Sequence, residues 1–234
     1  MIQDNIIEYS VLGIISLSCL ALFANFIFSL NIYFNTIIIS FCLCYLFFLN
    51  NRLIKKIIYY SIIISLISTI TITFDNTNRP DSGLYHLPFT SLLNGSKISF
   101  GVANINERFG IISIIQYLSA LNNNLIFNNI GILIPLVIIY SITLIFFINS
   151  FFKKNKSNLI KFLSFLFAIF ILTTSNRYSS FGNDAPAQFF YLILIYYFLE
   201  SSNDQRNEDH FKLISLLSIF VFLIKPFFIL SAII

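Results

Sequence analysis

The chain has 234 residues, of which 57% are hydrophobic and only 10% charged, with a mean hydropathy of +0.85 and a formal net charge of +4. Soluble domains carry about a quarter charged residues, so this composition excludes an ordinary soluble enzyme and is typical of a polytopic membrane protein. The small basic excess does not cover the face of a soluble domain, which excludes nucleic acid as a partner. Cys19, Cys42 and Cys44 lie inside apolar runs without metal-ligand spacing, as small hydrophobic residues do.

Seven apolar runs approach the roughly 20 residues that a helix needs to cross a bilayer. In chain order they are Ile6–Leu30, Ile32–Leu49, Ile57–Phe74, Phe127–Phe152, Leu159–Thr174, Ala187–Leu199 and Leu213–Ile234. The segment Ile111–Leu121 is too short to cross, so we expect it to lie against the membrane. The first run is no cleavable signal peptide, because its leading residues MIQDNIIE are acidic and the run is too long. The sequence therefore predicts an all-α polytopic transmembrane protein of about seven spans.

The placement of Lys and Arg predicts the orientation of these spans. The turns NNRLIKK and KKNKSN hold six of the basic residues, and the positive-inside rule assigns both turns to the cytoplasm. The N-terminus is then cytoplasmic, and two polar segments face outward, namely the loop from Asp75 to about Ile126 and the turn SNRYSSFGNDAPAQ. We interpret residues 1–234 as one integral membrane domain, with three spans in 1–74, an outer loop in 75–126 and four spans in 127–234. The last run ends at Ile234 without polar residues, so we expect a fragment of a longer protein.

The outer loop opens with RPDSGLYHLPF, which places Arg79, Asp81 and His86 close together. P-D-S-G is a turn signature, and one interpretation is that Asp81 or Ser82 only caps the helix that follows. The functional alternative is a carboxylate at the outer membrane boundary, suited to take a proton from an acceptor hydroxyl or to hold a divalent cation.

His86 follows Asp81 by five residues, so the two do not share one face of an α-helix. A kink at Pro88 could still direct both side chains toward one pocket. The alternative for His86 is a hydrogen bond to a lipid headgroup or a backbone carbonyl. Glu107 and Arg108 close the same loop, where an exposed pair between these neighbours is the simplest interpretation.

Arg177 and Asp184 flank SSFGN in the second outer turn, and Asp184 followed by Ala-Pro is a common helix start. Capping and a functional role are therefore both open for Asp184. Lys225 lies in FLIKPFF within the seventh run, where a lysine costs on the order of 2.5–3.5 kcal/mol by insertion scales. It either snorkels outward or marks a binding site or ion pair, and from its depth it could reach a lipid-borne phosphate at the outer surface.

Several of these motifs resemble a family of bacterial multi-pass membrane proteins. The stretch DSGLYHLPF, the loop NINERFGIISIIQYLSAL, the turn RYSSFGNDAPAQFF and the pattern IKPFFIL carry this resemblance, which covers residues 75 to 234. That family is similar in turn to the GT-C superfamily of integral-membrane glycosyltransferases. The resemblance implies a GT-C-like fold in the bacterial plasma membrane. It also implies a polyprenyl-phosphate sugar as donor and a cell-envelope glycan or lipid as acceptor.

By position, the resemblance makes Asp81 the loop carboxylate of the GT-C enzymes and Asp184 an acidic residue of a later outer loop. Many GT-C enzymes carry paired acids at the first position, whereas Ser82 follows Asp81 here. The reaction would use a carboxylate as base and cationic groups on the leaving phosphate, with Arg79, Arg108, Arg177, Lys225 and His86 as candidate substrate-binding residues. The sequence establishes no cofactor, and a divalent cation is compatible with the carboxylates.

Two other functional classes stay open. A transporter or flippase of lipid-linked glycans would also need outer charges and an intramembrane lysine, but the internal repeats typical of transporters are missing from the sequence. A polysaccharide polymerase or assembly subunit without transferase activity would fit the same topology. The sequence does not indicate an oligomeric state.

Overall fold

A computed structural model describes residues 5–49, 51–74, 79–110, 113–174, 181–203 and 208–228, and all regular structure within these ranges is helical. The α-helices are α1 (Asn5–Ile27), α2 (Ile32–Tyr45), α3 (Asn51–Phe74), α4 (Leu87–Gly95), α5 (Ile114–Asn122), α6 (Ile134–Phe152), α7 (Asn158–Thr173), α8 (Asp184–Asn203) and α9 (Glu208–Ile224). Short turns of 3-10 or π-helix lie between them: η1 (Leu46–Phe48), η2 (Ser82–His86), η3 (Val102–Asn104), η4 (Glu107–Gly110) and η5 (Asn128–Ile132).

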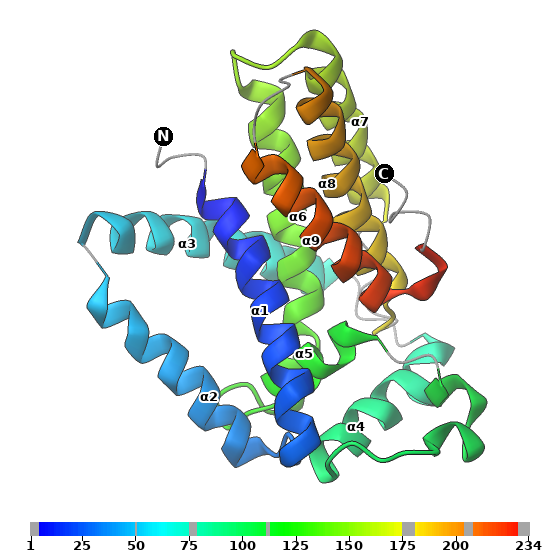
Figure 1. Ribbon diagram of the computed structural model, residues 1–234. Coiled ribbons are helices and arrows are strands. Elements are labelled where there is room, and N and C mark those ends of the chain that lie inside the picture. The colour runs from blue at the N-terminus through cyan, green and yellow to red at the C-terminus, as the bar shows by residue number, and fades with distance from the viewer. Residues whose placement is uncertain are drawn as a thin grey trace.

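The body of the molecule is a bundle built around α6, which packs against α1, α3, α5, α7 and α8. Helices α1, α6, α7, α8 and α9 run in alternating directions (Figure 1), so the outer loop and the start of α8 lie at one end, and the turn between α6 and α7 lies at the other. Helix α3 passes across α1 and α6 instead of running alongside them, and α2 diverges from the end of α1. The all-α prediction is confirmed.

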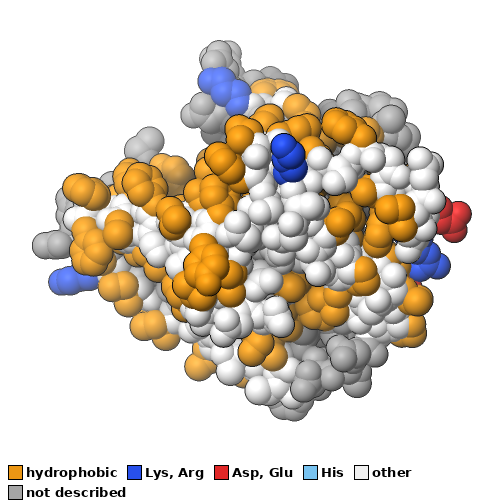
Figure 2. All heavy atoms as spheres, turned by 90° about the horizontal axis from the view of Figure 1, so that it is seen from below, with side chains coloured by type: hydrophobic (Ala, Val, Ile, Leu, Met, Phe, Trp, Pro, Cys, Tyr) orange, Lys and Arg blue, Asp and Glu red, His pale blue; other side chains and the backbone are white. Residues whose placement is uncertain are grey.

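Three helices of the described chain are long and apolar enough to cross a membrane, over Ile7–Ile27, Arg52–Thr73 and Ile134–Phe152. The apolar helices Ile32–Phe48, Asn158–Thr173 and Phe211–Ile224 are shorter. Hydrophobic side chains are scattered over the lower end of the molecule with few charged ones among them (Figure 2). Within the described residues, these observations are consistent with a membrane protein, and the number of about seven spans stays a prediction.

Several predicted boundaries are wrong for identifiable reasons. The residues NRLIKK, 51 to 56, form the start of α3 and not a turn before it, so the helix begins at Asn51 instead of Ile57. Helix α6 begins at Ile134, seven residues later than expected, because the turn η5 occupies the first residues of that run. Helix α9 ends at Ile224, since Pro226 disfavours a helical conformation for the residue before it and lacks a backbone donor.

The short segment in the outer loop forms α5, only nine residues long and thus far too short to cross a bilayer. Ser113 and Gln116 build a capping box at its start, and every residue from Ile114 to Leu121 is buried. The helix lies within the protein, against α1, α4 and α6. The expectation that this segment lies along the surface is therefore wrong. A helix at the membrane surface needs one face of polar side chains in contact with water, whereas the polar side chains of α5 are buried in the protein.

The side chains of two buried asparagines and one half-buried asparagine hold the ends of α1, α4 and α5 together beside the start of α2. The Asn35 amide nitrogen donates to the carbonyl oxygens of Leu30, Ala120 and Asn123 at 2.7–2.9 Å. Asn94 donates to the first two of these carbonyls as well, at 2.6 and 2.9 Å. Asn25 donates to carbonyl oxygens at the end of α4. We call Asn25, Asn35 and Asn94 the asparagine clasp, which donates hydrogen bonds to carbonyls at and just beyond the ends of α1, α4 and α5.

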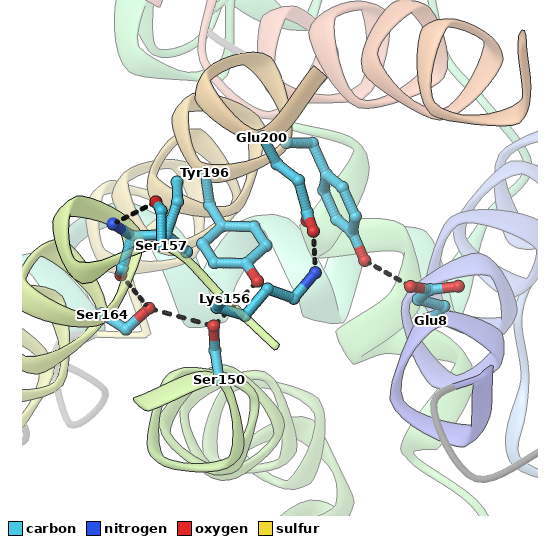
Figure 3. Close-up of polar contacts among 9 residues, drawn as sticks. Glu8, Ser150, Lys156, Ser157, Ser164, Tyr196 and Glu200 are labelled. Carbon is cyan, nitrogen blue, oxygen red and sulfur yellow. Dashed lines mark hydrogen bonds and ion pairs between the residues drawn. The ribbon is translucent and has the colours of Figure 1, made fainter. Parts of the chain in front are cut away.

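The opposite end of the bundle is joined by a second set of polar contacts (Figure 3). Lys156, in the turn after α6, forms an ion pair with Glu200 near the end of α8. The Tyr197 hydroxyl donates to Glu8 of α1 at 2.8 Å, and the Ser150 hydroxyl donates to Tyr196 at 2.8 Å. These contacts connect α1, α6 and α8 at the end farthest from the outer loop.

Candidate functional site

A single π-helical turn, η2, places the residues of the opening motif. The Leu87 N–H donates to the carbonyl of Ser82, five residues earlier. In an α-helix, positions five apart diverge by about 140° around the axis, whereas a π turn closes its hydrogen bond over five residues. The extra residue of the π turn therefore allows the side chains of Asp81 and His86 to point toward the same side of the helix. The predicted kink at Pro88 is not needed for this, since this proline lies in the first turn of α4.

Asp81 does not cap this turn. Its side chain makes no capping hydrogen bond, and its Oδ1 lies 3.3 Å from Nη1 of Arg108 in an ion pair with both side chains about half exposed. The Arg108 guanidinium carbon also lies 4.8 Å from the centre of the Tyr85 ring, within cation–π range. Arg108 is thus held by Asp81 and Tyr85, rather than by its neighbour Glu107.

His86 is buried beneath this pair, with 6% of its surface exposed. Its Nδ1 lies 3.1 Å from Nε2 of Gln116 on α5, and its ring centre is 4.0 Å from that of Tyr85. Burial lowers the pKa of His86 from 6.5 to about 4, although the Asp81 and Asp184 carboxylates oppose this shift. The imidazole is therefore neutral at physiological pH, and it is no isolated group at a lipid headgroup.

A second ion pair joins the two helices at the end of the chain. Asp184, the first residue of α8, pairs with the ammonium of Lys225, which directly follows α9. The lysine is therefore not inside a helix, as the sequence suggested, but beyond its end. Lys225 does form an ion pair, although one whose two side chains are partly exposed. The backbone can present the lysine here because Pro226 prevents α9 from continuing.

The two ion pairs lie close to one another. The charges of Asp81, Arg108 and Asp184 all act on the pKa of Tyr85, which burial chiefly raises, and all three also act on His86. In Figure 1 the start of α8 and the end of α9 lie directly above the segment that leads into α4. The loop around residues 79–110, the start of α8 and the end of α9 thus bring two carboxylates, two cations, a tyrosine and a neutral histidine to one end of the bundle. We call this group the charge cluster.

The remaining candidate residues contribute less to the geometry. The Arg79 carbonyl oxygen accepts from the Ser82 backbone at 3.0 Å and from the Ser82 hydroxyl at 2.5 Å, which fixes the start of the turn. Arg177 lies outside the described residues. No three His, Cys, Asp or Glu side chains of the described chain come close enough together to hold a metal ion. The carboxylates are occupied by cationic side chains, so the cluster does not fit a divalent cation.

Two further residues of the site escaped the sequence reasoning. Gln116 could have been identified, since S-I-I-Q at positions 113 to 116 matches a capping box. Tyr85 carried no such signal, because the chain contains 12 tyrosines and many lie in apolar runs. Beside Asp184, the buried side-chain oxygens of Asn183 and Gln188 have no hydrogen-bond partner in the described structure. Such acceptors are rare in folded proteins and call for a donor.

The family model described as "Domain of unknown function (DUF8201)" matches residues 1–234, so the chain belongs to this family. No curated protein and no solved structure matches the chain. The chemistry of the charge cluster must accordingly be argued from its own residues.

Proposed function

We propose that this member of the DUF8201 family is a multi-pass plasma-membrane glycosyltransferase. In this proposal it moves a sugar from a polyprenyl-phosphate donor to a glycan or lipid acceptor of the cell envelope. The observation that carries the proposal is the meeting of the Asp81–Arg108 and Asp184–Lys225 pairs beside His86. A reaction that moves a sugar between a phosphate and a hydroxyl needs a base, cationic groups for the departing phosphate and polar groups for the sugar.

Arg108 and Lys225 are suited to the donor phosphate. A guanidinium offers several donors in a fixed plane, and a lysine offers a compact positive charge. Lys225 lies at the end of an apolar helix, where a phosphate carried on a lipid chain would arrive from the membrane side. Since both cations are paired with carboxylates, the entering phosphate would compete with Asp81 and Asp184 for them.

Asp81 is the proposed base. The acceptor hydroxyl oxygen forms a bond to the anomeric carbon while the bond from that carbon to the phosphate oxygen breaks. The proton of the hydroxyl passes to the Asp81 carboxylate, and the bond electrons leave with the phosphate. Asp184 would orient Lys225, and the unpartnered oxygens of Asn183 and Gln188 could accept hydrogen bonds from sugar hydroxyls. No metal ion takes part in this scheme.

The reaction would take place on the outer face. The charge cluster lies at the end of the bundle opposite the turn that holds Lys153, Lys154 and Lys156, which the positive-inside rule assigns to the cytoplasm. A sugar already carried on a lipid phosphate needs no nucleotide there. The N-terminus would then be cytoplasmic.

The test is transfer of radiolabelled sugar from a polyprenyl phosphate in membranes containing the full-length protein. Loss of a general base lowers a rate by about 10²–10⁴-fold, so Asp81→Asn should abolish most transfer at normal expression. Glu107→Gln is the matched control, because this acid is exposed in the same loop but pairs with no partner in the described structure. Transfer by Asp81→Asn at the parent rate would remove Asp81 as the base. A parent protein that moves lipid-linked glycans across vesicles without transferring sugar would favour a flippase instead.

A further inference from the structure

The capping box of α5 fixes the direction of the Gln116 amide. The Ser113 backbone N–H donates to Oε1 of Gln116 at 3.2 Å, so the oxygen of the amide is turned toward the helix start. The nitrogen of the same amide is therefore turned toward His86, with Nε2 3.1 Å from Nδ1. Both side chains are at least nine-tenths buried, Gln116 at 5% and His86 at 6% exposure.

This contact determines the tautomer of the imidazole. An amide nitrogen can only donate, so His86 Nδ1 must accept and cannot carry a proton. A neutral histidine then carries its proton on Nε2, which becomes the only donor of the ring. Within the described residues, no hydrogen bond joins His86 Nε2 to another group.

We propose that Gln116 is a positioning residue that holds His86 as a neutral, Nε2-protonated hydrogen-bond donor toward an anionic oxygen bound at the charge cluster. The identity of that oxygen, a donor phosphate, rests on the proposed function, whereas the tautomer does not. A protonated His86 would place two N–H donors face to face at 3.1 Å, which Gln116 forbids. A neutral His86 ring adds no further positive charge beside Asp81. Since a neighbouring cation makes a carboxylate a weaker base, the basicity of Asp81 is preserved.

The charged groups around His86 do not decide its state by themselves. Asp81 and Asp184 favour the imidazolium, Arg108 and burial oppose it, and Tyr85 stacks beside it as a neutral ring. Lys225 is paired with Asp184. Gln116 is the uncharged group that distinguishes the two ring nitrogens, because it contacts only Nδ1.

The experiment is nitrogen NMR of the full chain labelled with ¹⁵N-histidine in detergent micelles. The sequence has two histidines, and His210→Asn assigns the spectrum. The parent should show the Nε2–H tautomer of His86 unchanged between pH 8 and pH 5.5. Gln116→Met should give a mixture of tautomers, and Gln116→Glu should favour a proton on Nδ1. An Nδ1–H tautomer in the parent, or a Gln116→Met spectrum identical to the parent's, would overturn the proposal.

The parent spectrum decides the tautomer even where a Gln116 variant fails to fold, and it requires no activity. A second arm adds a polyprenyl phosphate, which should shift the His86 Nε2–H resonance of the parent. Gln116→Met should bind this lipid about tenfold more weakly, the effect of one misplaced hydrogen bond. A correct tautomer with no shift would contradict the assigned ligand and leave Gln116 as a structural residue, whereas a shift without sugar transfer would contradict only the proposed reaction.

Discussion

A neutral histidine beneath two ion pairs makes the protein sensitive to acid. The pKa of His86 is lowered to about 4 in the folded chain and returns to about 6.5 on unfolding, so the unfolded state binds more protons between these values. Stability conferred by the neutral ring is complete above pH 6.5 and is lost as the pH falls toward 4. The loss is at most about 1.4 kcal/mol for each pH unit.

We therefore predict that thermal unfolding in detergent, followed by circular dichroism, shifts to lower temperature between pH 7 and pH 5. His86→Asn should reduce this dependence, because asparagine does not titrate. Equal pH dependence of the two proteins would show that other groups cause the acid sensitivity.

At the scale of single residues, the sequence identified the charges but not their partners. Asp81, Arg108, Asp184 and Lys225 were recognisable because charge is costly in so apolar a chain. The pairing of Arg108 with Asp81 and of Lys225 with Asp184 depends on tertiary structure, across 27 and 41 positions. Local reasoning favoured the neighbour Glu107 and missed the contact that the fold provides.

At the scale of helices, the asparagine clasp adds hydrogen bonds to a buried hydrophobic cluster where three helices end. Lipid tails solvate apolar side chains as well as a protein core does, so hydrogen bonds and close packing carry much of the association between helices in membranes. Each buried carbonyl that loses its donor costs about 1–3 kcal/mol. The clasp should therefore be a major determinant of how the outer loop attaches to α1 and α2.

Asn35→Ala should lower the free energy of unfolding by about 1–3 kcal/mol, because the Asn123 carbonyl loses its side-chain donor, whereas the carbonyls of Leu30 and Ala120 keep the amide of Asn94. Asn122→Ala is the control, since Asn122 makes one bond within its own helix, to the carbonyl of Leu118. Denaturant titration in detergent measures both. Equal effects of the two substitutions would contradict a special role for the clasp.

Helix boundaries were predictable only where the chain carries a local signal. Hydrophobic runs located α1, α2 and α7 to within a few residues, because burial in lipid or protein requires such runs. The π turn had no signal, since it adds one residue to a helix whose pattern is otherwise continuous. The burial of α5 was not predicted, because a short apolar helix has the same sequence pattern at a membrane surface as in a protein core.

At the scale of the whole molecule, the two ends of the bundle differ in their chemistry. The charge cluster lies at one end, whereas the Lys156–Glu200 and Tyr197–Glu8 contacts join the helices at the other (Figure 3). Glu200 follows Asp184 by 16 residues along α8, or about 24 Å, close to the thickness of a hydrocarbon core. In the proposed orientation, the bilayer would lie between these two polar ends.

Cysteine labelling tests this orientation. After Cys19, Cys42 and Cys44 are replaced by alanine, Ser99→Cys should react with an impermeant thiol reagent in intact cells, and Asn155→Cys should react only after permeabilisation. Both positions are exposed, one in the loop after α4 and the other in the turn after α6. The opposite pattern of labelling would place the charge cluster in the cytoplasm and exclude an outer-face reaction.

The π turn also has a consequence for what the site requires of its backbone. One residue more than an α-helix requires is stored between Ser82 and His86, and no atom lies within 4 Å of the position where Gly83 would carry a Cβ. Deleting that glycine would leave enough residues for an uninterrupted α-helix into α4 and would place Asp81 four residues before His86. Residues four apart lie about 40° from one another around an α-helix, so the acid and the histidine would still share one face. A single-codon deletion would thus distinguish a site that needs only this shared face from one that needs the wider π turn.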